Sequence, residues 1–200
     1  MPSHQRDPKA VFLNVPYDPG YERQFVALVA TIIAIGRIPR CVLEIAETGE
    51  GRLRRLLNLI RACEVSVHDL SRVGVPPRFN MPFELGLSCA IARSAPGYKY
   101  LLLERVQHRV QKTLSDLNGR DPYIHGGTVR GTVTCVLDAM RPRSGAPDVD
   151  EVYRFCRTMS IVAREIKRKR GRGTLFARTA FLDLVTLGTV RAQQLGFISS

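Results

Sequence analysis

The chain has 200 residues, 44% of them hydrophobic and 24% charged, with a formal net charge of +12. This composition is typical of one globular domain, alone or with an appendage. It argues against a membrane-bound protein, because even the longest apolar run, 26–36, is shorter than the roughly 18 residues that a bilayer span requires.

Apolar runs alternate with helical patterns along the first 140 residues. The continuous apolar runs predict buried strands at 10–15, 40–45, 64–70 and 98–104, with an edge strand within 122–127. Apolar residues at helical spacing predict helices through 25–33, 53–60, 80–93 and 128–140, with Gly36 and Asn80 as caps and a short helix or turn near 110–122. The run 26–36 is itself best explained as a buried helix.

This alternation implies βαβ units, a parallel sheet and helices on both of its faces. We therefore predict an α/β, flavodoxin-like three-layer domain over 10–140, with a parallel sheet of about five strands. The Pro-, Gly- and Ser-containing segment 141–148 indicates a linker. Two further helical patterns, at 149–170 and 174–196, predict a basic helical appendage over 149–198.

The positive charge is uneven. Residues 1–140 hold 18 Lys and Arg against 13 Asp and Glu, whereas residues 141–200 hold 12 against 5. Such an excess can attract nucleic acid, anionic lipid or an acidic partner. The cluster lacks interleaved aromatic rings, so a solvated helix end is the favoured explanation, and nucleic-acid binding through 164–178 is the weaker one.

Polar side chains gather where the predicted strands end. Asn14 closes the first strand, Tyr17 follows in its turn, Glu44 closes the second strand, and Asp69 with Ser71 closes the third. The carboxyl ends of parallel strands share one edge, where ligands of open α/β sheets bind, so these residues predict a pocket. The alternative is that they only cap local turns.

Glu84 is the most informative single residue. It lies between Phe83 and Leu85 in the first turns of an apolar helix, where packing alone does not require an acid. A carboxylate in such surroundings tends toward a raised pKa and a reactive role. The alternative is a favourable interaction with the helix dipole.

Several kinds of site find no support in the sequence. The four histidines have no metal-ligand spacing, and no two of the five cysteines form a CxxC motif. A GxSxG elbow, a Walker A motif and a GxGxxG after a strand are all lacking. Cysteines that serve only in packing, together with a polar N-terminal segment, lead us to expect a cytoplasmic protein.

Four segments carry a resemblance to a known group: VFLNVPYD (11–18), RCVLE (40–44), VHDLS (67–71) and RFNMPFELGL (78–87). Over about residues 10–140 the chain resembles bacterial TIR-like proteins and nucleoside 2-deoxyribosyltransferases. The resemblance implies that Glu84, in the context ELGLS, is the nucleophile and that Asp69 matches the acid after a middle strand. It also points to bacterial defence signalling.

We expect an enzyme that cleaves the N-glycosidic bond of NAD or a related nucleotide, either a NAD glycohydrolase or a nucleoside hydrolase or transferase. Glu84 would stabilise or trap the oxocarbenium-like state. Asp69 or Asn80 would hold ribose hydroxyls, and no metal or further cofactor is needed. The residues expected to bind substrate are Asn14, Tyr17, Asp69, Ser71, Arg72, Arg78, Asn80 and Ser88.

Two alternatives stay open. The same pocket could serve a non-catalytic nucleotide sensor or adaptor coupled to the helical tail, or the chain could be a nucleic-acid-associated module. Apolar positions within 149–196 predict that the tail packs on its own domain or on a second copy. TIR-like domains often act when assembled, so the resemblance favours a homo-oligomer.

Overall fold

The computed structural model describes residues 6–45, 51–72, 79–117, 119–140, 145–171 and 173–199. Its strands form one parallel sheet in the order β2-β1-β3-β4-β5, the flavodoxin-like order, so the predicted fold class is confirmed. The strands are β1 (Asp7–Asn14), β2 (Ile38–Cys41), β3 (Cys63–Asp69), β4 (Lys99–Glu104) and β5 (Tyr123–Ile124).

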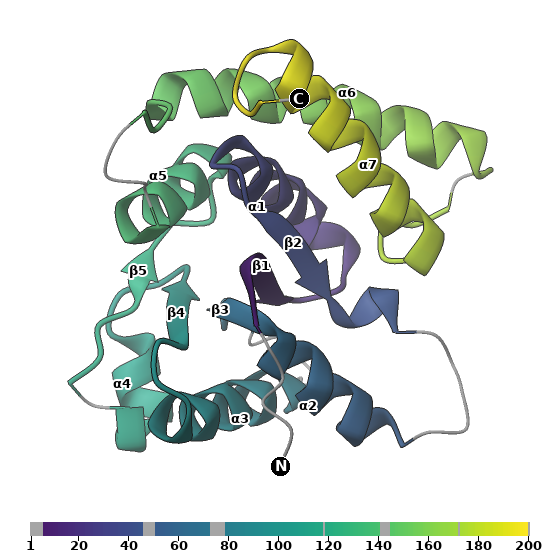
Figure 1. Cartoon of the computed structure of the whole chain (residues 1–200). Coiled ribbons are helices and arrows are strands. Elements are labelled where there is room, and N and C mark those ends of the chain that lie inside the picture. The colour runs from purple at the N-terminus through teal and green to yellow at the C-terminus, as the bar shows by residue number, and fades with distance from the viewer. Residues whose placement is uncertain are drawn as a thin grey trace.

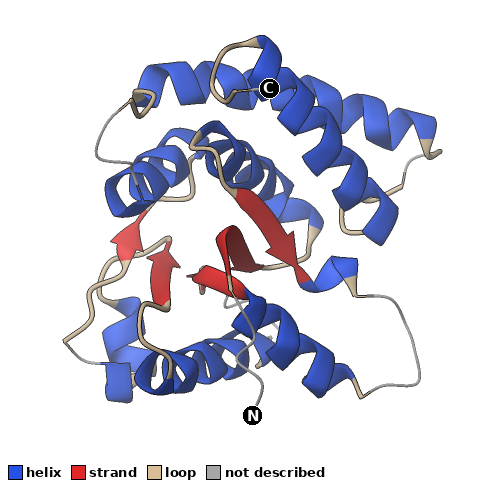
Figure 2. Ribbon diagram, viewed as in Figure 1, coloured by secondary structure: helices blue, strands red, loops and turns tan. Residues whose placement is uncertain are grey.

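Helices cover both faces of the sheet, and a further layer lies outside one of them (Figures 1 and 2). One face carries α2 (Arg52–Ala62), α3 (Asn80–Ser94) and the short α4 (Arg109–Thr113). The other face carries α1 (Glu22–Ala34) and α5 (Val129–Met140), and on these lie α6 (Val149–Lys169) and α7 (Arg178–Gln194). Among these helices, none is both long and apolar enough to cross a membrane.

Helix α1 is the centre of the packing. Every residue from Phe25 to Ala34 is buried, because the sheet covers one side of the helix and α5, α6 and α7 cover the others. A helix that is apolar all round must be enclosed in this way. Gly36 follows α1 with a left-handed φ of +74°, as predicted for the glycine that caps the end of this helix.

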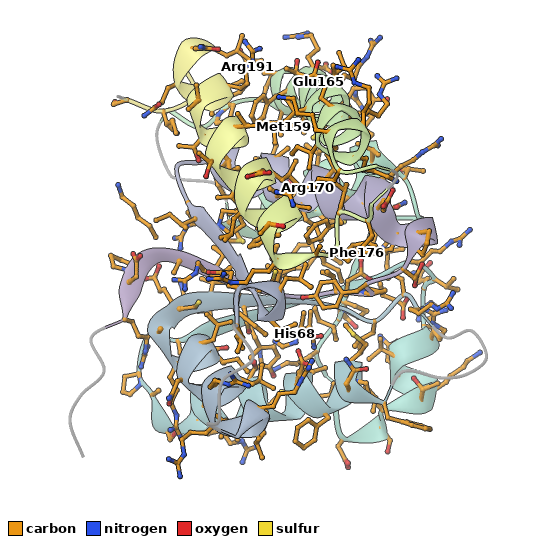
Figure 3. All side chains as sticks on the ribbon, turned by 90° about the vertical axis from the view of Figure 1, so that its right-hand side faces the viewer. His68, Met159, Glu165, Arg170, Phe176 and Arg191 are labelled. Carbon is orange, nitrogen blue, oxygen red and sulfur yellow. The ribbon has the colours of Figure 1, made fainter. Side chains whose placement is uncertain are left out.

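Helix α6 packs one apolar face on α1. It begins with a capping box in which Asp148 accepts from the Glu151 N–H (2.8 Å) and Glu151 accepts from the Asp148 N–H (2.9 Å). Helix α7 approaches closely at Gly188, where a Cβ atom would lie 2.6 Å from the Met159 side chain and 2.9 Å from that of Ile33. Figure 3 shows Met159 between α6 and α7. The C-terminal helices are therefore packed on their own chain, and assembly with a second copy stays a prediction.

Two local predictions differ from the structure. The second strand ends at Cys41 instead of continuing to 45, because the Glu44 carboxylate folds back onto the Cys41 N–H (2.8 Å) and the Arg40 guanidinium (2.6 Å) and closes a 3-10 turn. Asn80 is the first residue of α3 and not its cap. The N-cap residue is Phe79, and its side chain makes no capping hydrogen bond.

We expect Phe155→Ala in α6 to destabilise the protein by about 3–5 kcal/mol, since the ring is buried against α1 and Phe197 and its removal leaves a cavity. Ile161→Ala, on the exposed side of the same helix, should cost less than about 0.5 kcal/mol. Urea denaturation of the two variants measures both values. Equal, small losses would contradict the packing of α6 on the α/β domain.

Candidate functional site

The candidate site lies at the carboxyl edge of the sheet, between β1 and β3. These neighbouring strands lead to helices on opposite faces, which makes this the topological switch point where ligands of such sheets bind. β1 ends there with Asn14 and β3 ends with Asp69. The Asn14 amide donates to the Met81 carbonyl (2.9 Å) and to Nδ1 of the buried His68 (2.9 Å), which joins the first turn of α3 to the two strands.

The Asp69 carboxylate ties three loops together at this edge. Its side chain is fully buried, and Oδ2 accepts from the Tyr21 hydroxyl and from Nε2 of His125 (3.2 Å). Oδ1 accepts from the backbone N–H of Ser71 (2.9 Å) and from the Ser71 hydroxyl. Burial alone would raise the pKa of Asp69, but the hydrogen bonds from His125, Ser71 and Tyr21 outweigh it and hold the pKa below its ordinary value.

His125 is a residue of this cluster to which the sequence analysis gave no role. Its Nδ1 accepts from the Gly127 N–H (3.0 Å), so the neutral ring carries its proton on Nε2, which faces both Asp69 and the Ser71 hydroxyl (2.8 Å). A Ser-His-Asp triad needs the acid on the nitrogen opposite the serine, so this arrangement is not a triad. The available signal was its place within 122–127, the segment of the predicted edge strand, since a polar residue at the end of a strand was also what singled out Asp69.

A basic cavity of about 810 Å³ opens beside this cluster. The turn from β1 to α1 forms one wall, and the loops after β3, β4 and β5 form the others. Of the predicted site residues, Ser71 and Arg72 line it, and Arg72 pairs there with Asp18 (3.3 Å). The other charged or histidine side chains that line it are Arg23, Arg105, Arg109 and His125.

Glu84 lies at the same edge, in the second turn of α3. It is 5% exposed, and burial raises its pKa to about 7, although Arg52 and a hydrogen bond from Asn80 lower it in part. The charge of Glu84 in turn contributes to the raised pKa of Tyr17, after burial and Cys41, so the carboxylate lies within electrostatic range of the Tyr17 hydroxyl. The acid that the sequence singled out is thus a buried group whose proton titrates near neutral pH.

The remaining predicted residues are divided between edge and core. The Tyr17 ring packs edge-on against Phe25 and Phe176, and its hydroxyl is 3.4 Å from the Leu13 carbonyl. Ser88 is buried one turn beyond Glu84 and accepts from the Tyr98 hydroxyl (3.1 Å).

Arg78 belongs to the segment 73–78, which lies outside the described residues. Asn80 is exposed beside Glu84.

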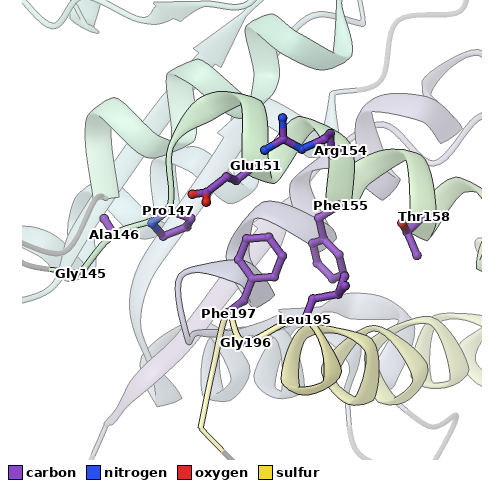
Figure 4. Close-up of a pocket in the computed structure, with 10 residues that line it drawn as sticks. All are labelled: Gly145, Ala146, Pro147, Glu151, Arg154, Phe155, Thr158, Leu195, Gly196 and Phe197. Atoms are coloured by element: carbon purple, nitrogen blue, oxygen red, sulfur yellow. The ribbon is translucent and has the colours of Figure 1, made fainter.

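A second cavity, of about 630 Å³, lies between the start of α6 and the end of α7 (Figure 4). Phe155 and Phe197 form its apolar side, and the Glu151 carboxylate at its rim is engaged in the α6 capping box. It gathers no set of groups suited to catalysis. Across the part of the chain that the structure describes, no group of three or more His, Cys, Asp or Glu side chains could hold a metal ion.

Comparison with known proteins gives no relative: no family model, curated protein or solved structure matches the chain. The functional argument therefore depends on the site itself.

We expect Asp69→Asn to lower the free energy of unfolding by about 3 kcal/mol or more, because an amide cannot accept from all four donors that the carboxylate satisfies. Asp138→Asn, an exposed substitution of the same kind, should change it little. Folding lowers the pKa of Asp69, so the ionised carboxylate contributes to the free energy of unfolding at a pH above its unfolded pKa of about 4. This contribution is lost as the pH falls through the folded pKa. Denaturation at pH 7 and pH 3 should show the difference shrinking in acid.

Glu84 should have the opposite effect on stability. Folding raises its pKa from 4.5 to about 7, so the folded protein loses stability as the pH rises through this range, by about 3 kcal/mol at most. We expect Glu84→Gln to be more stable than wild type at pH 8 and equal to it at pH 4.5. The exposed Glu165→Gln is the matched control, and a pH series of thermal melts that is parallel for all three proteins would contradict the burial of the charge.

Proposed function

We propose that this protein binds a nucleotide at the carboxyl edge of its sheet and cleaves the N-glycosidic bond, with Glu84 as the catalytic carboxylate. One observation carries the proposal: Glu84 is a buried acid at the switch-point edge, and its pKa is raised to about 7 by burial. Perturbed carboxylates in such places are typical of catalytic groups. The resemblance of 78–87 to the Glu context of the deoxyribosyltransferases supports the same role.

The chemistry needs one carboxylate. As the bond between the anomeric carbon and the base nitrogen breaks, positive charge develops on the sugar, and the ionised Glu84 stabilises that charge or bonds to the anomeric carbon. The electron pair of the broken bond leaves with the base. Water then attacks the anomeric carbon, and its oxygen displaces the Glu84 carboxylate where that bond had formed, while its proton passes to the departed base or to solvent. In a transfer reaction a nitrogen of a second nucleobase takes the place of water.

The neighbours of Glu84 fit supporting roles. Asn80 contacts the carboxylate and is exposed, so it can reach a ribose hydroxyl. Arg52, at the start of α2, favours the ionised form of Glu84. Asp69 is saturated by donors of its own chain, and we assign it the positioning of the surrounding loops instead of direct sugar binding.

We expect wild-type protein incubated with NAD and a panel of nucleotides to release a free base, detected by liquid chromatography and mass spectrometry. Glu84→Gln should reduce this release on the order of 10³-fold, the range of a positioned catalytic group. Glu165→Gln should leave it unchanged, since that carboxylate is exposed on α6. Equal turnover by a folded Glu84→Gln protein would exclude the catalytic role, and binding without any product would favour the sensor or adaptor.

Nucleic-acid contact is the weaker candidate, and one observation favours it. Arg154, Arg157, Arg164 and Arg168 are exposed at spacings of three, seven and four residues, which places them along one side of α6. Such a row can meet a phosphate backbone. This function would make no use of Glu84 or of the edge at which it lies.

A further inference from the structure

The basic cavity beside Asp69 is a separate feature from the Glu84 carboxylate. It is bounded by Pro16 to Tyr21 on one side and by the loops that carry Arg105 and Gly127 on the other. Its volume of about 810 Å³ is within the range of small-molecule sites. The charge on its walls indicates what kind of molecule it accepts.

Two of its arginines are held in place by acids. Arg109 donates from Nε to Oε2 of the buried Glu104 (3.0 Å), makes a second contact to that carboxylate through Nη2, and donates to the Leu70 carbonyl (3.2 Å). Arg72 pairs with Asp18. Their charges are therefore balanced, and they give the cavity a fixed polar wall.

Arg23 and Arg105 differ in this respect. Both are exposed at the cavity, and neither makes an ion pair with any residue that the structure describes. Arg105 crosses over Gly127, where a Cβ atom would lie 2.9 Å from its Nε, and Gly127 has φ +73°. The positive φ of Gly127 favours glycine at this position, and the exposed Arg105 side chain lies over it. The Gly127 carbonyl accepts from Gln24 (2.5 Å), which fixes the loop beneath the guanidinium.

The amino end of α1 adds to this positive character. Arg23 and Gln24 belong to its first turn, at the positive end of the helix dipole, although a 3-10 turn precedes it and the Glu22 N–H donates to the Pro19 carbonyl. Glu22, the acid of that turn, is paired with Lys167 (2.7 Å) and does not cancel the effect. The cavity thus combines the positive end of the α1 dipole with two guanidinium groups that have no ion-pair partner among the described residues.

We infer that this cavity binds the phosphate groups of a nucleoside diphosphate or dinucleotide. Arginine is the side chain best suited to phosphate oxygens, because its planar donors bond them in pairs. The site stands on its own geometry. The phosphate site also implies that the substrate is a phosphorylated nucleotide in preference to a free nucleoside. This implication rests on the proposed cleavage by Glu84. The turn 16–21 lines the cavity, and it also contains Tyr17, whose pKa the charge of Glu84 helps to raise.

The test is calorimetric titration of Glu84→Gln protein, in which the proposed cleavage is suppressed, with ADP, inorganic pyrophosphate and adenosine. We expect ADP and pyrophosphate to bind and adenosine to bind at least tenfold more weakly than ADP. Adding Arg23→Gln and Arg105→Gln should weaken ADP binding by about tenfold to a hundredfold, the effect of losing charge-assisted hydrogen bonds. Thermal melts of each variant establish that it is folded.

The control removes the same amount of charge at the opposite edge of the sheet. Arg61, at the end of α2, and Lys99, at the start of β4, are exposed there, and Arg61→Gln with Lys99→Gln should leave ADP binding unchanged. An equal loss in this control, or equal binding of ADP and adenosine, would overturn the phosphate site. If the wild-type protein cleaves no nucleotide but the binding pattern holds, the cleavage proposal fails and the phosphate site remains.

Discussion

The carboxyl edge of this protein depends on one buried carboxylate. Asp69 ends the central strand β3 and has no contact with solvent, a position that an unpaired charge could not occupy. Tyr21, Ser71 and His125 supply the donors that compensate it, and each comes from a different loop. The same bonds that stabilise the charge therefore fix the start of α1, the end of β3 and the loop after β5, which together form the walls of the basic cavity.

Two acids at one edge thus have opposite environments. Asp69 is surrounded by donors and is held ionised, whereas burial dominates around Glu84 and raises its pKa. Environments that move the pKa values of two carboxylates apart are the usual way in which one site provides a charged positioning group and a reactive group. It also means that Glu84 costs stability at neutral pH, and a group kept at a cost to folding is better explained by function than by packing.

The sequence predicted the sheet because apolar runs and helical spacing are local signals, and it predicted Glu84 because an acid on an apolar helix is a local anomaly. It could not predict that Tyr21 and His125 would meet at Asp69, since they are 48 and 56 residues away from it in the chain and only the strand order brings them together. The turn at Val42–Glu44 was missed for a different reason. There a side chain bonds the backbone three residues earlier, and this bond overrides the apolar pattern of the strand.

The buried helix α1 explains why the C-terminal helices belong to the fold and how they can reach the site. With no polar face, α1 needs cover on the side away from the sheet, and α5, α6 and α7 supply it. The connection between α6 and α7 places Phe176 against Tyr17, with ring centroids 5.6 Å apart, and Figure 3 shows Phe176 at the level of the sheet. Tyr17 lies within electrostatic range of Glu84 and belongs to the turn 16–21 that lines the cavity. A ligand or partner that displaced Phe176 would therefore act directly on the β1–α1 turn, so the contact offers a physical route between the basic tail and the basic cavity.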